Sequence, residues 1–446
     1  MNKTRALVAL LLTALLLPAP LAAQTGEARA PGAPGKDAQW LSAGKHGVGT
    51  SASLDSKVWF TLHGGALTEV YYPDVTIGNV EKLELVVAHQ EFPTVQTETR
   101  DTVSRVVPDA DSLTFTQINT AKNGEYRIEK RYTVDPQRSV LLIDIKFTGN
   151  LKRRMDGYDL YVNYDPSLNN SGMHDTAFTE NGALLASDGD KASALVTASG
   201  PWREGVRGGF TSTTNGFAGV SDGLTLMERA RPHAFPPAFD SYARAEKGNV
   251  VQLGKLPTPS LAPSTYTVAL GFAKTPAEAL SDARASLRKG FAAVEAEYRR
   301  GWQDYVKTLP QVGAKYQAQF NMAAMILKAH EDKLHRGANI ASLSVPWGGG
   351  SNANEANVGG YHLVWSRDLY QVATAYMALG DKAAAVRALD FLFKVQQKPD
   401  GSFPQNSWLD GRPYWGSLQH DEVAFPLILA HQLGQTDRET YTRHVR

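Results

Sequence analysis

The sequence contains no cysteine, no excess of charge of one sign and no apolar run long enough to span a bilayer. The absence of cysteine from 446 residues excludes disulfide bonds, thiolate metal sites and a cysteine nucleophile. Lys and Arg total 46 against 45 Asp and Glu, so the basic surface that nucleic acid requires is missing. We therefore expect no nucleic-acid partner, and a neutral ligand fits this composition better. Stability without disulfides has to come from large apolar cores, which this length permits.

The N-terminus has the pattern of a secretory signal peptide. Lys3 and Arg5 precede an apolar run at 6–17, and proline and small residues follow it up to Ala23. The run is shorter than the roughly 20 residues that a transmembrane helix needs. We expect residues 1–23 to be removed and the protein to be secreted or periplasmic, with no membrane attachment after cleavage.

Residues 24–275 are predicted to form a large antiparallel β-sandwich domain. Apolar and polar residues alternate along many short segments between turn residues, as expected of strands with one buried face. The clearest case is a hairpin, in which the segments 126–134 and 141–147 flank a turn at 135–138. Many such strands over this length are typical of a sandwich.

The period of the apolar residues changes at Pro276. Spacings of three, four and seven residues up to Tyr305 predict one long linker helix over 276–309, capped at Thr275 and ended by Pro310. Residues 310–446 continue with helical patterns and form the third predicted unit. The helices expected there are Lys315–Leu334, Arg367–Leu379, Lys382–Val395 and Asp421–Leu433.

Two clusters of aromatic and polar residues lie where loops enter these helices. The first, at 360–370, contains Trp365 and the adjacent pair Arg367 and Asp368; the second, at 410–421, contains Trp415. Aromatic rings stack on the C–H faces of sugars, and a guanidinium beside a carboxylate suits vicinal hydroxyls. A capping Asp next to core aromatics would give the same composition, so both interpretations stay open at this point.

Longer stretches of the sequence resemble a known family. The stretch YHLVWSRDLYQVATAY at 361–376 resembles the signature of bacterial glucoamylases and glucodextranases of glycoside hydrolase family 15. The segments 30–51, SLSVPWG at 342–348 and PYWGSLQHDEVAFPLILA at 413–430 resemble the same family. The resemblance implies an N-terminal antiparallel β super-sandwich, a linker helix and an (α/α)6 barrel, here incomplete. It also implies inverting, exo-acting hydrolysis of terminal α-linked glucose. We expect no cofactor, and no metal site because the eleven histidines include no His-x-x-x-His pair typical of zinc ligands.

The resemblance also implies roles for individual residues. Arg367 and Asp368 would bind hydroxyls of the terminal glucose of an α-glucan, either a maltooligosaccharide or an isomaltooligosaccharide. Tyr361 would lie beside the developing oxocarbenium charge, Trp365 would form a wall of the same subsite, and Trp415 would support the catalytic acid. The choice between α-1,4 and α-1,6 bonds stays open.

The sequence departs from the family at the catalytic carboxylates. Inversion needs two carboxyl groups about 6.5–9.5 Å apart, and the family's acid lies in a Trp-Glu-Glu motif that this chain lacks. Glu422 is the one candidate substitute, but the family has no acid in that block, and an acidic residue in a first helical turn compensates the helix dipole. We therefore expect an N-terminal portion of a hydrolase, monomeric at full length and inactive by itself.

An incomplete barrel should leave apolar helix faces partly uncovered. The residues expected to show this are Leu369, Val372, Leu389, Leu392, Phe425 and Ile428. Two other functions remain as alternatives. An inverting disaccharide phosphorylase would share the domain order, although the signal peptide counts against it, and a non-catalytic glycan-binding module would act through the β domain.

Overall fold

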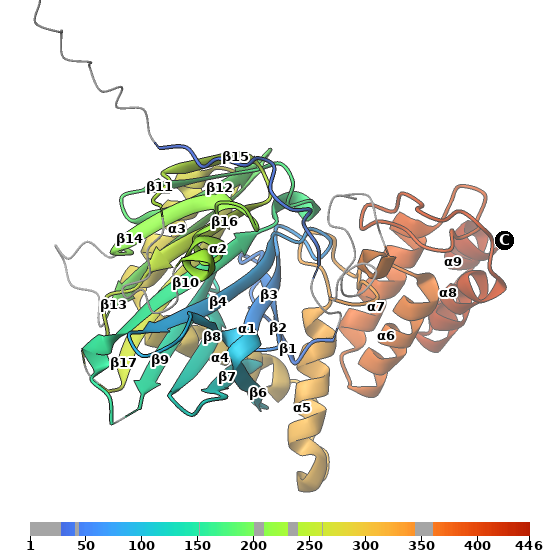
Figure 1. Cartoon of the computed structure of the whole chain (residues 1–446). Coiled ribbons are helices and arrows are strands. Elements are labelled where there is room, and N and C mark those ends of the chain that lie inside the picture. Colours follow the sequence, from blue (N-terminus) through green and yellow to red (C-terminus); the bar gives the residue numbers. More distant parts are fainter. Residues whose placement is uncertain are drawn as a thin grey trace, which may run out of the picture.

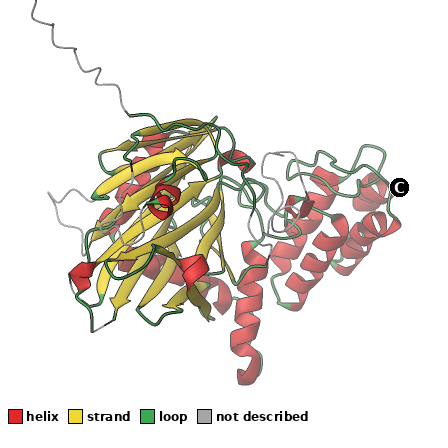
Figure 2. Ribbon diagram, viewed as in Figure 1, coloured by secondary structure: helices red, strands yellow, loops and turns green. Residues whose placement is uncertain are grey.

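The computed structural model describes residues 28–40, 44–150, 152–199, 209–230, 240–260, 262–343 and 360–446. Within them, two antiparallel sheets pack face to face, and helices follow on one side (Figures 1 and 2). The predicted sandwich followed by helices is therefore confirmed. The signal peptide, the segment 344–348 and Trp347 lie outside the described residues.

The first sheet has eight strands. In spatial order they are β1 (Gly47–Thr50), β2 (Trp59–His63), β3 (Ala66–Tyr71), β4 (Val80–His89), β10 (Tyr158–Pro166), β16 (Val250–Lys255) and β14 (Ser212–Phe217), with β5 (Gln96–Thr97) paired to β4. Two short helices, α1 (Glu98–Asp101) and α2 (Gly223–Arg229), lie among its connections. The single-turn 3-10 helices Met155–Gly157 and Leu168–Asn170 flank β10.

The second sheet has nine strands. In spatial order they are β15 (Arg244–Gly248), β11 (Asp175–Glu180), β12 (Ala183–Asp188), β13 (Lys191–Ser199), β17 (Ser264–Ala273), β9 (Val140–Gly149), β8 (Tyr126–Val134), β7 (Thr114–Ala121) and β6 (Thr102–Asp109). The predicted hairpin is confirmed as β8 and β9, with Ile128 opposite Phe147. Apolar side chains of the two sheets meet in one core, where Phe60 and Tyr132 stack with ring centroids 5.6 Å apart.

The predicted linker helix is two helices, so the expectation of one continuous helix over 276–309 is wrong. The chain forms α3 (Pro276–Lys289) and α4 (Phe291–Lys307), which meet at Gly290 with a φ of 85°. Only glycine adopts this conformation at little cost, and the turn sends the helices along different strands. α3 packs on β13 and β17, whereas α4 packs on β8.

The remaining helices lie beside one end of the sandwich (Figure 1). They are α5 (Ala314–Ala329), α6 (Ser366–Ala378), α7 (Lys382–Phe391), α8 (His420–Gln432) and α9 (Arg438–Thr440), with a 3-10 turn at Gly360–His362 and π-helical turns at Leu392–Gln396 and Tyr441–Val445. Gly380 and Asp381 separate α6 from α7 as predicted, and the Asp381 carboxylate caps α7 by accepting from the Ala384 amide at 3.0 Å. α5 ends before the predicted Leu334, because Asp332 accepts the amides of Leu334 and His335 and thereby favours a turn.

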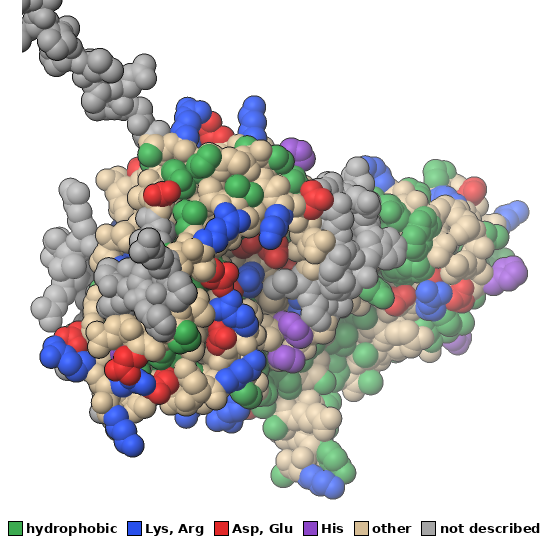
Figure 3. Space-filling view, viewed as in Figure 1, with side chains coloured by type: hydrophobic (Ala, Val, Ile, Leu, Met, Phe, Trp, Pro, Cys, Tyr) green, Lys and Arg blue, Asp and Glu red, His purple; other side chains and the backbone are tan. Residues whose placement is uncertain are grey.

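The apolar faces of the helices are covered more fully than expected. Leu369, Leu389 and Leu392 are at most 1% exposed, so the prediction is wrong for these three. Side chains of α6, α7, α8 and the loop after α7 bury one another in the main core cluster. Ile428 on α8 is 42% exposed, as expected of an uncovered face. Apolar atoms are also conspicuous on the surface of the helical part in Figure 3.

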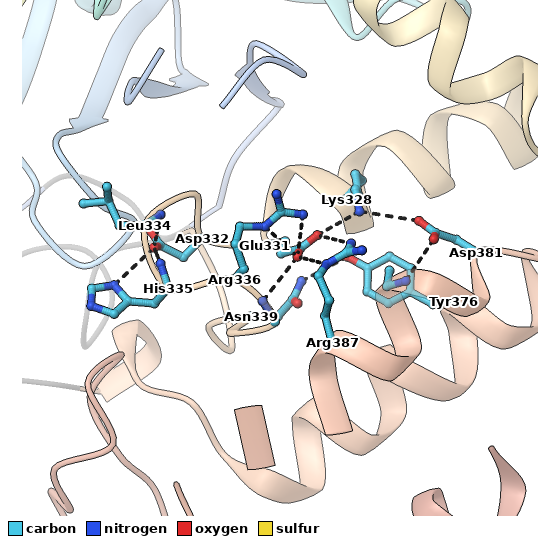
Figure 4. A network of polar contacts seen from close by, with 12 residues as sticks. Lys328, Glu331, Asp332, Leu334, His335, Arg336, Asn339, Tyr376, Asp381 and Arg387 are labelled. Atoms are coloured by element: carbon cyan, nitrogen blue, oxygen red, sulfur yellow. Dashed lines mark hydrogen bonds and ion pairs between the residues drawn. The ribbon is translucent and has the colours of Figure 1, made fainter. Parts of the chain in front are cut away.

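Charged side chains join the helical part to the sandwich at the end of α5. The Glu331 side chain is 4% exposed and accepts from Lys328, Arg336 and Arg387 at 2.8–3.0 Å (Figure 4). Asp332 accepts the amide of Val75, in the sandwich, at 3.2 Å. The buried Lys333 ammonium donates to Ser56 O at 2.7 Å, so Asp332 and Lys333 bond the sandwich while Glu331 ties the end of α5 to α7.

Candidate active site

The two sequence clusters come together where the N-termini of α6 and α8 meet. A short antiparallel bridge joins Val364, just before α6, to Ser407 in the loop before α8, with N···O distances of 2.9 and 3.0 Å. Gln396 strengthens this bridge by donating to Val364 O and to the Ser407 hydroxyl, both at 2.9 Å. The structure therefore brings together two clusters that the sequence showed only as separate segments.

Arg367 occupies the centre of this meeting point. Its Nη1 donates to Asp421 Oδ2 at 2.9 Å and to Gln419 Oε1 at 3.4 Å, and its guanidinium lies 5.4 Å from the Trp365 ring centroid. The hydrogen bond with Asp421 raises the pKa of Arg367, and the same bond lowers the pKa of Asp421. The Arg367 side chain is nevertheless 39% exposed, so part of it is accessible to solvent.

Asp368 lies next to this guanidinium but is not held by it. Its Oδ2 is 3.7 Å from Arg367 Nε, and its side chain is 44% exposed. Partial burial raises the pKa of Asp368, which Arg367 opposes. An accessible carboxylate beside an accessible guanidinium can accept from one hydroxyl while the arginine donates to another.

Aromatic rings line the same region. Trp365 and Trp415 meet edge to face with centroids 5.5 Å apart, and Tyr414 continues the row at 5.4 Å from Trp415. Trp408 lies 5.7 Å from Tyr414 at a right angle. Trp415 is 36% exposed, so part of its ring is accessible from solvent.

Tyr361 is the one predicted site residue that is not joined to the others. Its side chain is 49% exposed on the 3-10 turn at Gly360–His362. Between Tyr361 and the other four predicted residues, the structure has no hydrogen bond, ion pair or ring contact. Its expected place beside the reacting carbon stays a prediction.

Glu422 points into the protein instead of toward the exposed aromatics. Its side chain is fully buried, and Oε2 accepts the Arg367 amide at 2.7 Å and also bonds the Ser366 hydroxyl. Burial raises the pKa of Glu422, and its bonds to Ser366 and Arg367 oppose the rise. The sequence placed this residue in the first turn of its own helix, but it could not indicate these contacts with α6.

Gln419, Asp421 and Glu422 are the site residues to which sequence reasoning assigned no function. All three contact Arg367. The only sequence signal for these three residues was their position in the block that resembles the family. Their partner, Arg367, lies on a helix more than 50 residues earlier in the chain, so the sequence did not indicate the contact.

Comparison with known proteins identifies the family. Residues 30–307 match "Glucodextranase, domain N", and residues 315–445 match "Glycosyl hydrolases family 15". The chain belongs to glycosyl hydrolases family 15. The chain is also 36% identical over 409 residues to a curated glucoamylase from Clostridium sp. (strain G0005). The alignment covers 91% of this chain and 55% of that relative.

Solved structures support the same assignment. A bacterial glucoamylase complexed with acarbose superposes with a TM-score of 0.84 at 35% identity, covering 94% of this chain and 59% of that one. This similarity supports an (α/α)6 barrel arrangement for the helices. A putative kojibiose phosphorylase from the human microbiome superposes with a TM-score of 0.51 at 9% identity over 92% of this chain and 59% of that chain, which shows a shared fold alone. The chain thus spans little more than half the length of these glucoamylases.

Two further features bear on what the site can bind. Among the described residues, no group of three or more His, Cys, Asp or Glu side chains is arranged to hold a metal ion. In the same part of the chain, no helix has both the length and the apolar character to cross a membrane.

Proposed function

We propose that the protein containing this chain is an exo-acting hydrolase that releases terminal α-linked glucose from α-glucans with inversion. The observation that carries the proposal is the accessible pair Arg367 and Asp368 beside the edge-to-face indoles of Trp365 and Trp415. A terminal glucose presents vicinal hydroxyls to the charged pair and a C–H face to an indole. The acarbose complex of the similar glucoamylase supports an oligosaccharide ligand.

We propose that Arg367 and Asp368 bind and orient the glucose and do not transfer protons themselves. An arginine stays protonated in water, and Asp368 is adjacent to the guanidinium that would bind the same sugar. Proton transfer needs a raised-pKa acid on the leaving oxygen and a base that activates water on the opposite face. The Trp-Glu-Glu motif of the family's acid is absent from this sequence, and Glu422 is fully buried.

The chain by itself is accordingly proposed to release no glucose. The test compares purified residues 24–446 with the longest natural protein that contains them, on maltotetraose and on isomaltotriose. Glucose from the longer protein alone supports the proposal, and β-glucose as the first product, followed by NMR, supports inversion. Glucose release by residues 24–446, or α-glucose as the first product, contradicts the corresponding part.

The same experiment separates the alternatives. Activity that requires inorganic phosphate and yields glucose 1-phosphate supports the phosphorylase. Binding of maltooligosaccharides by residues 24–275 without any turnover in the longer protein supports a glycan-binding module. A hydrolase gives phosphate-independent release of free glucose.

The proposed hydrolase acts outside the cytoplasm as a monomer. The support is the basic, apolar and small-residue order of the first 23 residues. Cell fractionation and size-exclusion chromatography of the mature protein test both statements, and retention of residues 1–23 in the purified protein contradicts the first.

A further inference from the structure

Helix α6 begins without a cap of its own. Its N-cap residue is Trp365, whose side chain makes no capping hydrogen bond. The first amides of a helix have no partner inside the helix, so an indole at this position would leave them unsatisfied. Glu422 from α8 supplies the missing acceptor, because Oε2 accepts the Arg367 amide at 2.7 Å. The cap thus comes from another helix, and position 365 is free to carry an aromatic ring.

The same carboxylate also holds the side chain of Arg367. Glu422 Oε1 is 3.3 Å from Arg367 Nη1, so one carboxylate engages both the backbone and the guanidinium of one residue. Asp421 contacts the same Nη1 at 2.9 Å, but its side chain is 39% exposed. An exposed side chain can rotate into solvent, whereas the fully buried Glu422 is fixed by its packing.

We propose that Glu422 is a positioning residue that keeps Arg367 oriented for the terminal glucose; this rests on the function proposed above. The charged groups facing it are Arg367 from α6 and Asp421 from α8, and the arginine balances the buried carboxylate. A carboxylate removed from water interacts strongly with its partner, and breaking such a pair from one side is costly. Glu422 acts through Arg367 and does not contact the sugar.

The test measures the inhibition constant for glucose, which reports the glucose-binding subsite and does not depend on the fraction of folded enzyme. The natural full-length protein hydrolyses p-nitrophenyl α-glucoside while glucose competes. Glu422→Gln keeps the size of the side chain and an acceptor for the Arg367 amide, but it removes the charge from the guanidinium. The inhibition constant should rise about tenfold, in line with the coupling measured for close charge pairs.

A double-mutant cycle distinguishes positioning from general stability. In an Arg367→Ala background, Glu422→Gln should change the inhibition constant less than twofold, because its effect passes through the missing arginine. The matched control is Glu331→Gln, another buried glutamate of the helical part, which should lower the unfolding temperature and leave the constant unchanged. A tenfold effect that persists in the Arg367→Ala background overturns the proposal.

The remaining outcomes are also decisive. A wild-type inhibition constant in E422Q refutes the positioning role while leaving the hydrolase intact. A wild-type protein that cleaves no α-glucoside refutes the proposed function and this proposal with it. If E422Q does not fold, Glu422→Asp replaces it as the test variant, because it keeps the charge but withdraws the carboxylate by one methylene. An unchanged inhibition constant for glucose in Glu422→Asp refutes the positioning role of Glu422.

Discussion

Replacing Glu331 with glutamine should destabilise the helical part by about 3 kcal/mol at neutral pH. The Glu331 side chain is 4% exposed and is surrounded by Lys328, Arg336 and Arg387 (Figure 4). These partners lower its pKa from 4.5 to about 2. The lowering of the pKa by about 2.5, at about 1.36 kcal/mol per pH unit, gives about 3.4 kcal/mol, which rounds to the value above.

The sign of the pH dependence follows from the lowered pKa. The folded protein binds a proton on Glu331 more weakly than the unfolded chain does. The stabilisation of the folded state by the Glu331 carboxylate is therefore complete above pH 4.5 and is lost as the pH falls through 2. The difference between wild type and E331Q should be constant from pH 8 to 5. It should shrink to about 2 kcal/mol at pH 3.5.

Differential scanning calorimetry of the purified chain at pH 7, 5 and 3.5 measures this difference. At about 2–4 °C per kcal/mol for a domain of this size class, the unfolding temperature should fall by about 6–12 °C at pH 7. The control is Glu439→Gln, whose side chain is 82% exposed and lies 3.5 Å from Arg443; it should shift the temperature by less than about 1 °C. A decrease in the unfolding temperature of E331Q by less than about 3 °C at pH 7, or a decrease that is not smaller at pH 3.5, would refute the reasoning.

Three further changes test other parts of the structure. Gly290→Ala should lower the free energy of unfolding, measured by chemical denaturation, by about 1 kcal/mol, because a φ of 85° is strained for alanine although no atom lies within 4 Å of the new methyl. Gly301→Ala, inside α4, should instead leave the free energy of unfolding unchanged or raise it. Equal effects of the two changes would contradict this account. Glu98→Gln should lower the free energy of unfolding by about 3–5 kcal/mol, because it leaves the fully buried Lys130 without its counter-charge. An unchanged midpoint of unfolding in urea would contradict this expectation. Arg367→Ala should lower kcat/KM on maltotetraose at least 100-fold in the full-length protein. It should also lower the unfolding temperature, because it leaves the buried Glu422 without its counter-charge. A loss of kcat/KM below fivefold would contradict the binding role of Arg367.

The periodicity of the sequence predicted the hairpin β8–β9 and the helices α5 to α8, because alternating or helical burial of apolar side chains explains each of them. The strands β8 and β9 follow from side chains that alternate between core and surface, and the stop at Gly380 and Asp381 follows from local helix-ending chemistry. The break at Gly290 was missed, because the apolar face continues across it. A glycine in a helical pattern is compatible with either a helix or a turn, and only the strands under α3 and α4 decide between them.

Buried charge was the main feature that periodicity could not predict. Lys130 occupies an inward position of β8 and pairs with Glu98, both fully buried, although the sequence separates them by more than 30 residues. The lysine alone suggests an exposed face. Only the packing of α1 against the sheet shows that this charge is neutralised.

The sequence by itself determined that a β-sandwich precedes helices, the resemblance to the family, and the candidate site residues Trp365, Arg367, Asp368 and Trp415. Local patterns and the resemblance of the stretch 361–376 carry that information. The tertiary structure decided which carboxylate serves Arg367 and why Glu422 is buried, because both depend on where α8 meets α6. A side chain's partner depends on distance in space, and residues separated by more than 50 positions become neighbours only when the chain folds.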